Sequence, residues 1–351
     1  MNRLKSLLSL LIITTFLFSS CEKDEKTIGK YENGAFITNE GAYNHTNASV
    51  SYFDFSTNTV TNDIFASTNG RPIGDVLQSA YRANGKVFFV LNNSSKVEIA
   101  DENDITEIDV IEGLNSPRYL TVNGGKAYIS QWGDNGKVKV VDLNTLETVK
   151  TIEVGDGPEG VLAFNNQIWV ANSGGFSKDS TITIINPITN EVFKTIKLDG
   201  HCPQQMVVDK NNDVWVLCSG YVDYYSTPNT HTPSKLIKIS STTYEVTKSL
   251  TISSNQHPMK LDISSNGETV YFGAGFGYTG IYTVSITATS IPSNPIINDS
   301  FYGFNVNPKN NEIFCLKAPS FTDNGLLKRY SSTGQFIDEH TVGIGPNGIL
   351  F

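Results

Sequence analysis

The stretch Ser116-Pro117-Arg118-Tyr119-Leu120 opens a unit of roughly forty residues that recurs along the chain. Each opening joins a small or polar residue, a proline, a variable residue and the start of an apolar strand. The pattern returns at 157–161, 202–206, 257–261 and 345–349. Leu77 and Tyr302 take the place of the proline in two further openings. Self-similarity at such a period marks a repeat architecture, so we expect seven units.

Each unit has the content of a propeller blade. The unit after Ser116 holds four strand-like runs separated by turns rich in asparagine and glycine, at 119–122, 127–130, 138–142 and 148–154. Four short strands per repeat describe a blade. The first unit has only three (35–38, 50–55 and 60–64), and the chain ends on an orphan opening. We predict an all-β, seven-bladed β-propeller spanning 31–351, closed by pairing of the C-terminal strand with the N-terminal blade, with almost no helix.

The N-terminus has the layout of an exported lipoprotein. Arg3 and Lys5 precede an apolar run at 7–18 that is too short to span a bilayer. Small residues then lead directly to Cys21, as in a bacterial lipobox. The sequence predicts a signal peptide at 1–20, lipidation at Cys21 and a flexible tether at 21–30, so that the protein contacts the membrane only through its lipid anchor. The alternative is an ordinary signal peptide with an incidental cysteine.

The sequence favours buried free thiols for the remaining cysteines. Cys202 and Cys218 fall on the first two strands of one blade, in a compartment that permits disulfides. Counting around the Asn211-Asn212 turn places Cys202 opposite Tyr221, so a disulfide would need an irregular hairpin. Cys315 has no partner in sequence, and no pair has zinc-ligand spacing.

Charge and motifs restrict the function. A net charge of -9 without a basic cluster argues against a nucleic-acid partner or an anionic membrane surface. The histidines have no recurrent acidic neighbour, and no hydrolase elbow, metalloprotease helix or P-loop is present. We expect no enzyme activity, no catalytic residues, no metal and no cofactor. His45, His231 and His257 fall on the loop side, which leaves a metal or lactone hydrolase open.

The long loops are the candidate binding surface. Loops between the second and third strands are glycine-rich and polar, yet they carry aromatic residues that have no core to fill. These residues are Tyr43, Trp132, Phe176, Tyr221, Tyr224, Tyr225, Phe276, Tyr278 and Phe321. Packing against neighbouring loops is the alternative reading for each one.

A second set of residues is predicted on the same side, around the mouth of the central channel. It consists of the position just after the proline in each opening, namely Gln78, Arg118, Glu159, Gln204, Met259, Gly303 and Asn347. Channel mouths are also polar simply because they hold water. Arg118 and Glu159 lie on adjacent blades and can pair with each other.

The first unit carries a family resemblance. Asn39-Glu40-Gly41 and Gly74-Asp75-Val76-Leu77-Gln78 are similar to YncE-like surface-layer propellers of Bacteroidetes. These include the BtuG family, surface lipoproteins that capture corrinoids such as cobalamin. The charged run at 22–26 resembles the export tag of lipoproteins that Bacteroidetes display on their outer membrane. The resemblance implies an outer-membrane lipoprotein facing the cell exterior, which hands its ligand to a TonB-dependent transporter.

A second function remains open at this point. The same loops could make a surface scaffold that binds a protein or glycan rather than a small molecule. A small-ligand site requires the aromatic side chains to converge toward the axis, whereas a protein-binding face requires them to point outward.

Overall fold

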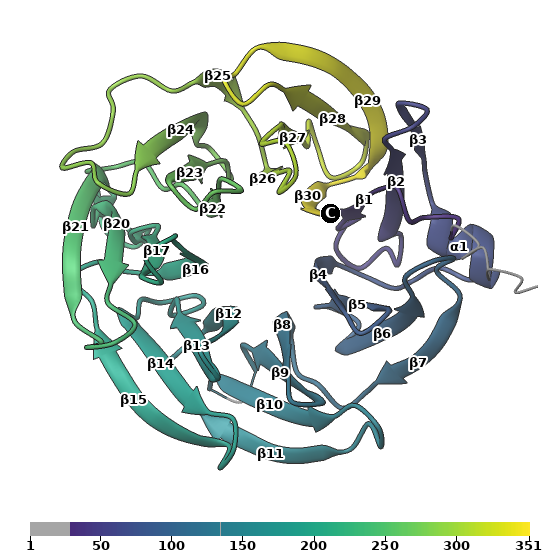
Figure 1. Ribbon diagram of the computed structural model, residues 1–351, viewed down its shortest axis with the longest axis horizontal. Helices are drawn as coiled ribbons and strands as arrows, with labels where there is room; N and C mark the ends of the chain where they lie inside the picture. The colour runs from purple at the N-terminus through teal and green to yellow at the C-terminus, as the bar shows by residue number, and fades with distance from the viewer. Residues whose placement is uncertain (1–28, 134) are drawn as a thin grey trace, which may run out of the picture.

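The computed structural model describes residues 29–133 and 135–351. Within them the chain forms seven four-stranded sheets, arranged as blades around a central axis (Figure 1). The predicted signal peptide, the lipidation site Cys21 and most of the tether lie outside the described residues. The prediction of an all-β, seven-bladed propeller is confirmed.

The blades follow one another in chain order, and the strands of each blade are named from the innermost one outward. Blade 1 has β30 (Pro346–Leu350), β1 (Gly34–Asn39), β2 (Ser49–Asp54) and β3 (Thr59–Thr61). Blade 2 has β4 (Leu77–Ala83), β5 (Lys86–Leu91), β6 (Lys96–Asp101) and β7 (Glu107–Ile111). Blade 3 has β8 (Pro117–Asn123), β9 (Lys126–Gln131), β10 (Lys137–Asp142) and β11 (Thr148–Glu153). Blade 4 has β12 (Pro158–Phe164), β13 (Gln167–Asn172), β14 (Thr181–Asn186) and β15 (Glu191–Lys197).

The last three blades repeat this plan. Blade 5 has β16 (Pro203–Val208), β17 (Val214–Cys218), β20 (Ser234–Ile239) and β21 (Val246–Ser253). Its long loop contains a small hairpin of β18 (Val222–Asp223) and β19 (Thr230–His231). Blade 6 has β22 (Lys260–Ile263), β23 (Thr269–Gly273), β24 (Thr279–Ser285) and β25 (Ile297–Ser300). Blade 7 has β26 (Gly303–Val306), β27 (Ile313–Lys317), β28 (Asn324–Tyr330) and β29 (Phe336–Ile344).

The ring closes through the two ends of the chain. The C-terminal strand β30 pairs antiparallel with β1, and Ile37 lies opposite Ile349. In Figure 1 the yellow C-terminal strand therefore lies inside the purple N-terminal blade. This pairing covers the inner edge of β1 and gives the first blade the same four strands as the other blades, with β30 innermost. The predicted closure is confirmed.

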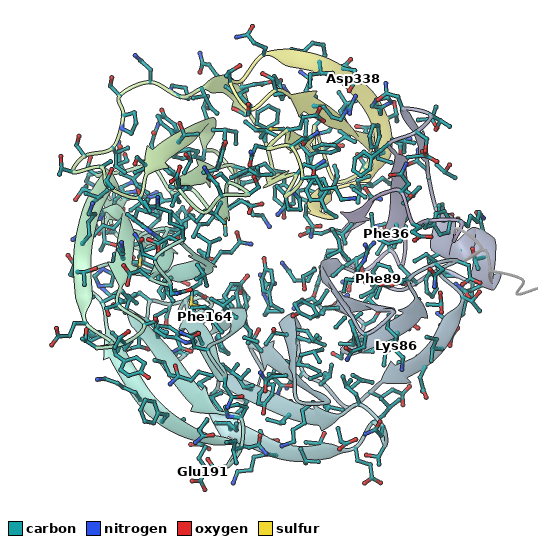
Figure 2. The ribbon with its side chains drawn as sticks, viewed as in Figure 1. Phe36, Lys86, Phe89, Phe164, Glu191 and Asp338 are labelled. Carbon is teal, nitrogen blue, oxygen red and sulfur yellow. The ribbon has the colours of Figure 1, made fainter. Side chains whose placement is uncertain are left out.

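The core consists of the layers between neighbouring blades. Both faces of a blade are covered, so an inner strand such as β5 is a continuous apolar run rather than an alternating one. Successive side chains point to opposite faces: Phe89 packs with Phe36 toward blade 1, and Phe88 packs with Ile129 toward blade 3. Figure 2 shows Phe36 and Phe89 in the inner part of their blades, while Glu191 lies at the outer rim.

A short helix corrects one predicted strand. The run expected at 60–64 ends as β3 at Thr61, and Ile64 instead begins α1 (Ile64–Asn69). The helix forms because Ile64 and Phe65 are consecutive, and both are buried between blades 1 and 2, which an alternating edge strand would not allow. Across the described residues no helix has the length and apolar character needed to cross a membrane.

The predicted buried thiols are confirmed, but the strand pairing predicted around Cys202 is wrong. Cys202, Cys218 and Cys315 are buried free thiols. Pro203 pairs with Cys218, so Cys202 lies next to Ser219 and not Tyr221, and the Ser219 amide donates to the Cys202 carbonyl at 3.0 Å. The turn is centred on Asn211 rather than between Asn211 and Asn212, which shifts the pairing by one residue, and a bulge at Gln204 shifts it by another.

Candidate functional site

The openings of the blades and the connections between second and third strands lie on one face of the ring, which we call the loop face. Neighbouring strands of a blade are antiparallel, so the loop between the second and third strands lies at the same end of the blade as the start of its first strand. At the centre of this face lies a pocket of about 480 Å³, which we call the mouth pocket. Six predicted site residues line it: Tyr43, Gln78, Arg118, Glu159, Gln204 and Phe321. Met259 of the predicted channel ring lines it too.

Arg118 organises the floor of the mouth pocket. Its Nε and Nη2 donate to the two carboxylate oxygens of Glu159 at 2.9 and 2.7 Å, so the pairing considered from the sequence is present. Its Nη1 donates to Oε1 of Gln78 at 2.5 Å, and its guanidinium lies 4.1 Å from the centre of the Trp132 ring. A bidentate pair stacked on an indole is held in one geometry. The floor is therefore rigid and nearly neutral at this point.

Asn347 belongs to the ring closure. It is 2% exposed, and its Oδ1 accepts from the Thr38 hydroxyl at 2.5 Å. Its Nδ2 donates to the carbonyls of Leu77 and Gln78, each at 3.0 Å. The amide therefore holds the closing strand to blades 1 and 2, and it faces the narrow channel beneath the mouth pocket rather than the pocket itself.

Two other positions of the predicted ring, Gln204 and Gly303, have structural roles. The Gln204 amide donates to the Cys202 carbonyl at 3.3 Å and to the Ser219 hydroxyl at 3.2 Å, which orients its side chain at the pocket wall. Gly303 has no side chain to offer, because a Cβ there would meet the Asn347 carbonyl oxygen at 2.4 Å. Backbone approach, not ligand contact, explains this glycine.

A buried carboxyl group forms part of the wall. Glu40 accepts from Asn347 Nδ2 at 2.8 Å and from the Tyr302 hydroxyl at 3.0 Å. Burial raises the pKa of Glu40, and the hydrogen bond from Asn347 and the charge of Lys260 oppose that rise. The acid is thus fixed between the first and last blades.

A second pocket of about 600 Å³ lies beside the mouth pocket on the loop face, and we call it the side pocket. Trp132 and Phe176 line it with ring centres 5.3 Å apart, and Tyr43 lines both pockets. The indole Nε1 of Trp132 is buried without a hydrogen-bond partner among the described residues. An unpaired buried donor is costly, so a ligand acceptor here would remove a penalty.

The other predicted aromatic residues do not converge on the axis. Tyr224, Tyr225 and Phe276 are 75%, 98% and 82% exposed and line neither pocket. Tyr221 is half-buried, with Lys178 Nζ 5.5 Å from its ring centre.

Tyr278 corrects the prediction. It is 2% exposed and packs edge-on to Tyr282 at 6.2 Å, beside an outer cavity of about 540 Å³. The loop at 274–280 is short, and positive φ values at Gly275 and Gly277 turn this ring inward instead of toward the ligand face.

Two histidines meet on the loop face. His231 Nδ1 lies 2.9 Å from His257 Nε2, and the two rings are nearly parallel, with 12° between their planes. Nδ1 of His257 lies 2.6 Å from the Ser219 carbonyl oxygen, which fixes the proton on that nitrogen. In residues 29–133 and 135–351, no three His, Cys, Asp or Glu side chains gather into a metal-binding group.

Sequence reasoning missed four polar or aromatic side chains of the mouth pocket. These are Glu40, Tyr119, Lys260 and Tyr302. Tyr119 and Lys260 each stand two positions after the proline of their opening, whereas the prediction took the position directly after it. Because β8 and β22 start at the pocket rim, the second position also faces the axis, and the repeat could have shown this.

Comparison with known proteins supports the architecture. A family model described as "Domain of unknown function (DUF5074)" matches residues 33–343. No curated protein matches the chain in sequence.

Three solved structures illustrate the likeness. A quinonprotein alcohol dehydrogenase-like protein from Bacteroides thetaiotaomicron is 17% identical with a TM-score of 0.67, over 92% of this chain and 79% of that one. The β-propeller domain of Cps50 (Swd1) from Myceliophteria thermophila is 11% identical with a TM-score of 0.61, over 82% and 91%. Streptogramin B lyase is 17% identical with a TM-score of 0.56, over 75% and 83%. At such identity the likeness shows the fold alone.

Proposed function

The chain belongs to the DUF5074 family, and we propose that its loop face binds a bulky amphipathic ligand without transforming it. The mouth pocket carries this proposal. It combines aromatic walls, from Tyr43, Tyr302 and Phe321, with a rigid polar floor around Arg118. Concave sites of a few hundred Å³, mostly apolar with a few fixed polar groups, are the usual form of small-molecule sites.

A corrinoid such as cobalamin is our first candidate ligand. The resemblance of Asn39-Glu40-Gly41 and its neighbours to BtuG-type propellers suggests it. Its broad ring would need more room than the mouth pocket alone, and the side pocket adjoins it through Tyr43. The ring edge carries amides, which would suit Gln204 and the unpaired Trp132 Nε1.

The cellular setting that we propose follows from the N-terminal sequence. Lipidation at Cys21 would anchor the propeller to the outer membrane, and the tether would hold it at the cell exterior. A TonB-dependent transporter would then receive the ligand from the loop face.

Titration of residues 22–351 with cyanocobalamin by calorimetry tests the proposal. We expect saturable binding that Tyr43→Ala and Phe321→Ala each weaken by about tenfold, as for aromatic anchors in a binding site. Phe193→Ala is the matched control, because Phe193 is 55% exposed on the outer strand β15. Absence of saturation at high micromolar ligand would remove the corrinoid proposal.

The exposed aromatic residues favour a second candidate, a protein or glycan partner. Phe176, Tyr224, Tyr225 and Phe276 are all at least 75% exposed on the loop face. Aromatic side chains that project from a rigid scaffold make adaptable contact surfaces. A glycan array probed with the wild type and with the Tyr224→Ser/Tyr225→Ser double variant tests this candidate. Binding that is lost in the double variant but kept in Tyr43→Ala would favour it over the small-molecule site.

A further inference from the structure

The charged side chains of the mouth pocket differ in whether they have a hydrogen-bond or ion-pair partner. Arg118 and Glu159 form a bidentate pair, and Glu40 accepts two hydrogen bonds. Lys260 is the remaining charged residue of the lining, and its ammonium group has no hydrogen bond or ion pair to any described residue. Lys260 is therefore the one charged side chain of the described pocket lining that has no direct partner.

Lys260 lies where a ligand would reach it. It is the first residue of β22, half-buried, and it lines both the mouth pocket and the narrow cavity of about 110 Å³ beneath it. Tyr119 lines the same two cavities, and its hydroxyl also lacks a partner among the described residues. Two free donors thus mark the junction of the pocket and the channel.

The charged groups around Lys260 are bonded to residues other than Lys260. The neighbouring ion pair of Arg118 and Glu159 is neutral as a unit. Both oxygens of Glu40 accept hydrogen bonds from other residues, Asn347 and Tyr302, and neither accepts one from Lys260. Water satisfies the ammonium group as long as the pocket is open. A ligand that fills the pocket removes this water, and a buried unpaired ammonium is strongly unfavourable.

We propose that the mouth pocket selects ligands that carry an anionic group, a phosphate, sulfonate or carboxylate, which pairs with Lys260 while an apolar body packs between Tyr43 and Phe321. A lysine ammonium is a compact point charge that binds such groups without demanding a bidentate geometry. The Tyr119 hydroxyl supplies a second donor. The inference rests on the proposed function only in placing the ligand in the mouth pocket.

A matched pair of fluorescent probes separates charge from apolar contact. 8-Anilinonaphthalene-1-sulfonate carries a sulfonate, and N-phenyl-1-naphthylamine has the same rings without it. Both are titrated into residues 22–351 as the wild type, Lys260→Met, Lys260→Arg and Lys86→Met. Lys86 is the control because it starts β5 at the opposite face and forms no ion pair within the described residues. Circular dichroism confirms that each variant is folded.

We expect Lys260→Met to weaken binding of the sulfonate probe at least about tenfold, because the variant loses one charge-assisted hydrogen bond. The affinity for the neutral probe should change by less than about twofold. Lys260→Arg should restore most of the affinity, and Lys86→Met should change neither probe. Equal effects on both probes, no effect on the sulfonate probe, or no binding of either probe to the wild type would each overturn the inference.

Failure of this inference can be distinguished from failure of the corrinoid proposal. Cyanocobalamin binding that Lys260→Met leaves unchanged would overturn the anion requirement alone. Lys260-dependent binding of the sulfonate probe without cyanocobalamin binding would remove only the corrinoid.

Discussion

Replacement of Glu159 by alanine should destabilise the propeller far more than loss of an exposed ion pair. The Glu159 side chain is 4% exposed and that of Arg118 is 14% exposed, so the variant leaves a guanidinium buried without its carboxylate. Breaking a buried pair on one side costs about 3–5 kcal/mol. Arg118 keeps Gln78 and the face of Trp132, so we expect about 3 kcal/mol, the lower end of that range.

Urea denaturation followed by circular dichroism measures this free energy of unfolding. The control is Glu268→Ala, because Glu268 and Lys210 form an ion pair that is about half exposed on the other face, and such pairs contribute about 0–1 kcal/mol. The Arg118→Met/Glu159→Met double variant removes both charges and should be more stable than Glu159→Ala. A loss for Glu159→Ala no larger than that for Glu268→Ala would refute the reasoning.

Three further outcomes follow from the structure. Removal of residues 346–351 takes away β30 and uncovers the inner edge of β1, so thermal unfolding should lose its single cooperative transition and gel filtration should show aggregation. Burial lowers the pKa of His257 from its ordinary value of 6.5, so the unfolded chain binds the proton more readily. Stability measured by urea midpoint should therefore fall as pH drops below about 6.5, and less steeply in His257→Gln. Burial raises the pKa of the Cys202 thiol to about 12 and that of Cys315 well above its usual range. A thiol-specific disulfide reagent should accordingly react slowly with the native protein and rapidly in denaturant.

The sequence predicted the scaffold because the scaffold is local and repeated. A proline opening such as 116–120 followed by apolar runs and tight turns specifies strand positions within each blade, and observed strands such as β8 to β11 lie within two residues of their expected bounds. The orphan opening at the C-terminus predicted the closure for the same reason. The departures were the helix at Ile64 and the register of Cys202, where a buried pair and a bulge overrode the repeat.

The sequence by itself determined that aromatic residues gather on one face, since strand order alone assigns the loops to that face. The tertiary structure decided which of them form a pocket: Tyr43 and Phe321 reach the axis, Tyr225 points into solvent and Tyr278 enters the core. It also placed Lys260 without a partner next to a neutralised Arg118. Such pairings join residues from different blades, and loop conformations do not follow the repeat. The physical reason is that the direction of a loop side chain depends on packing between blades, which no periodic pattern encodes.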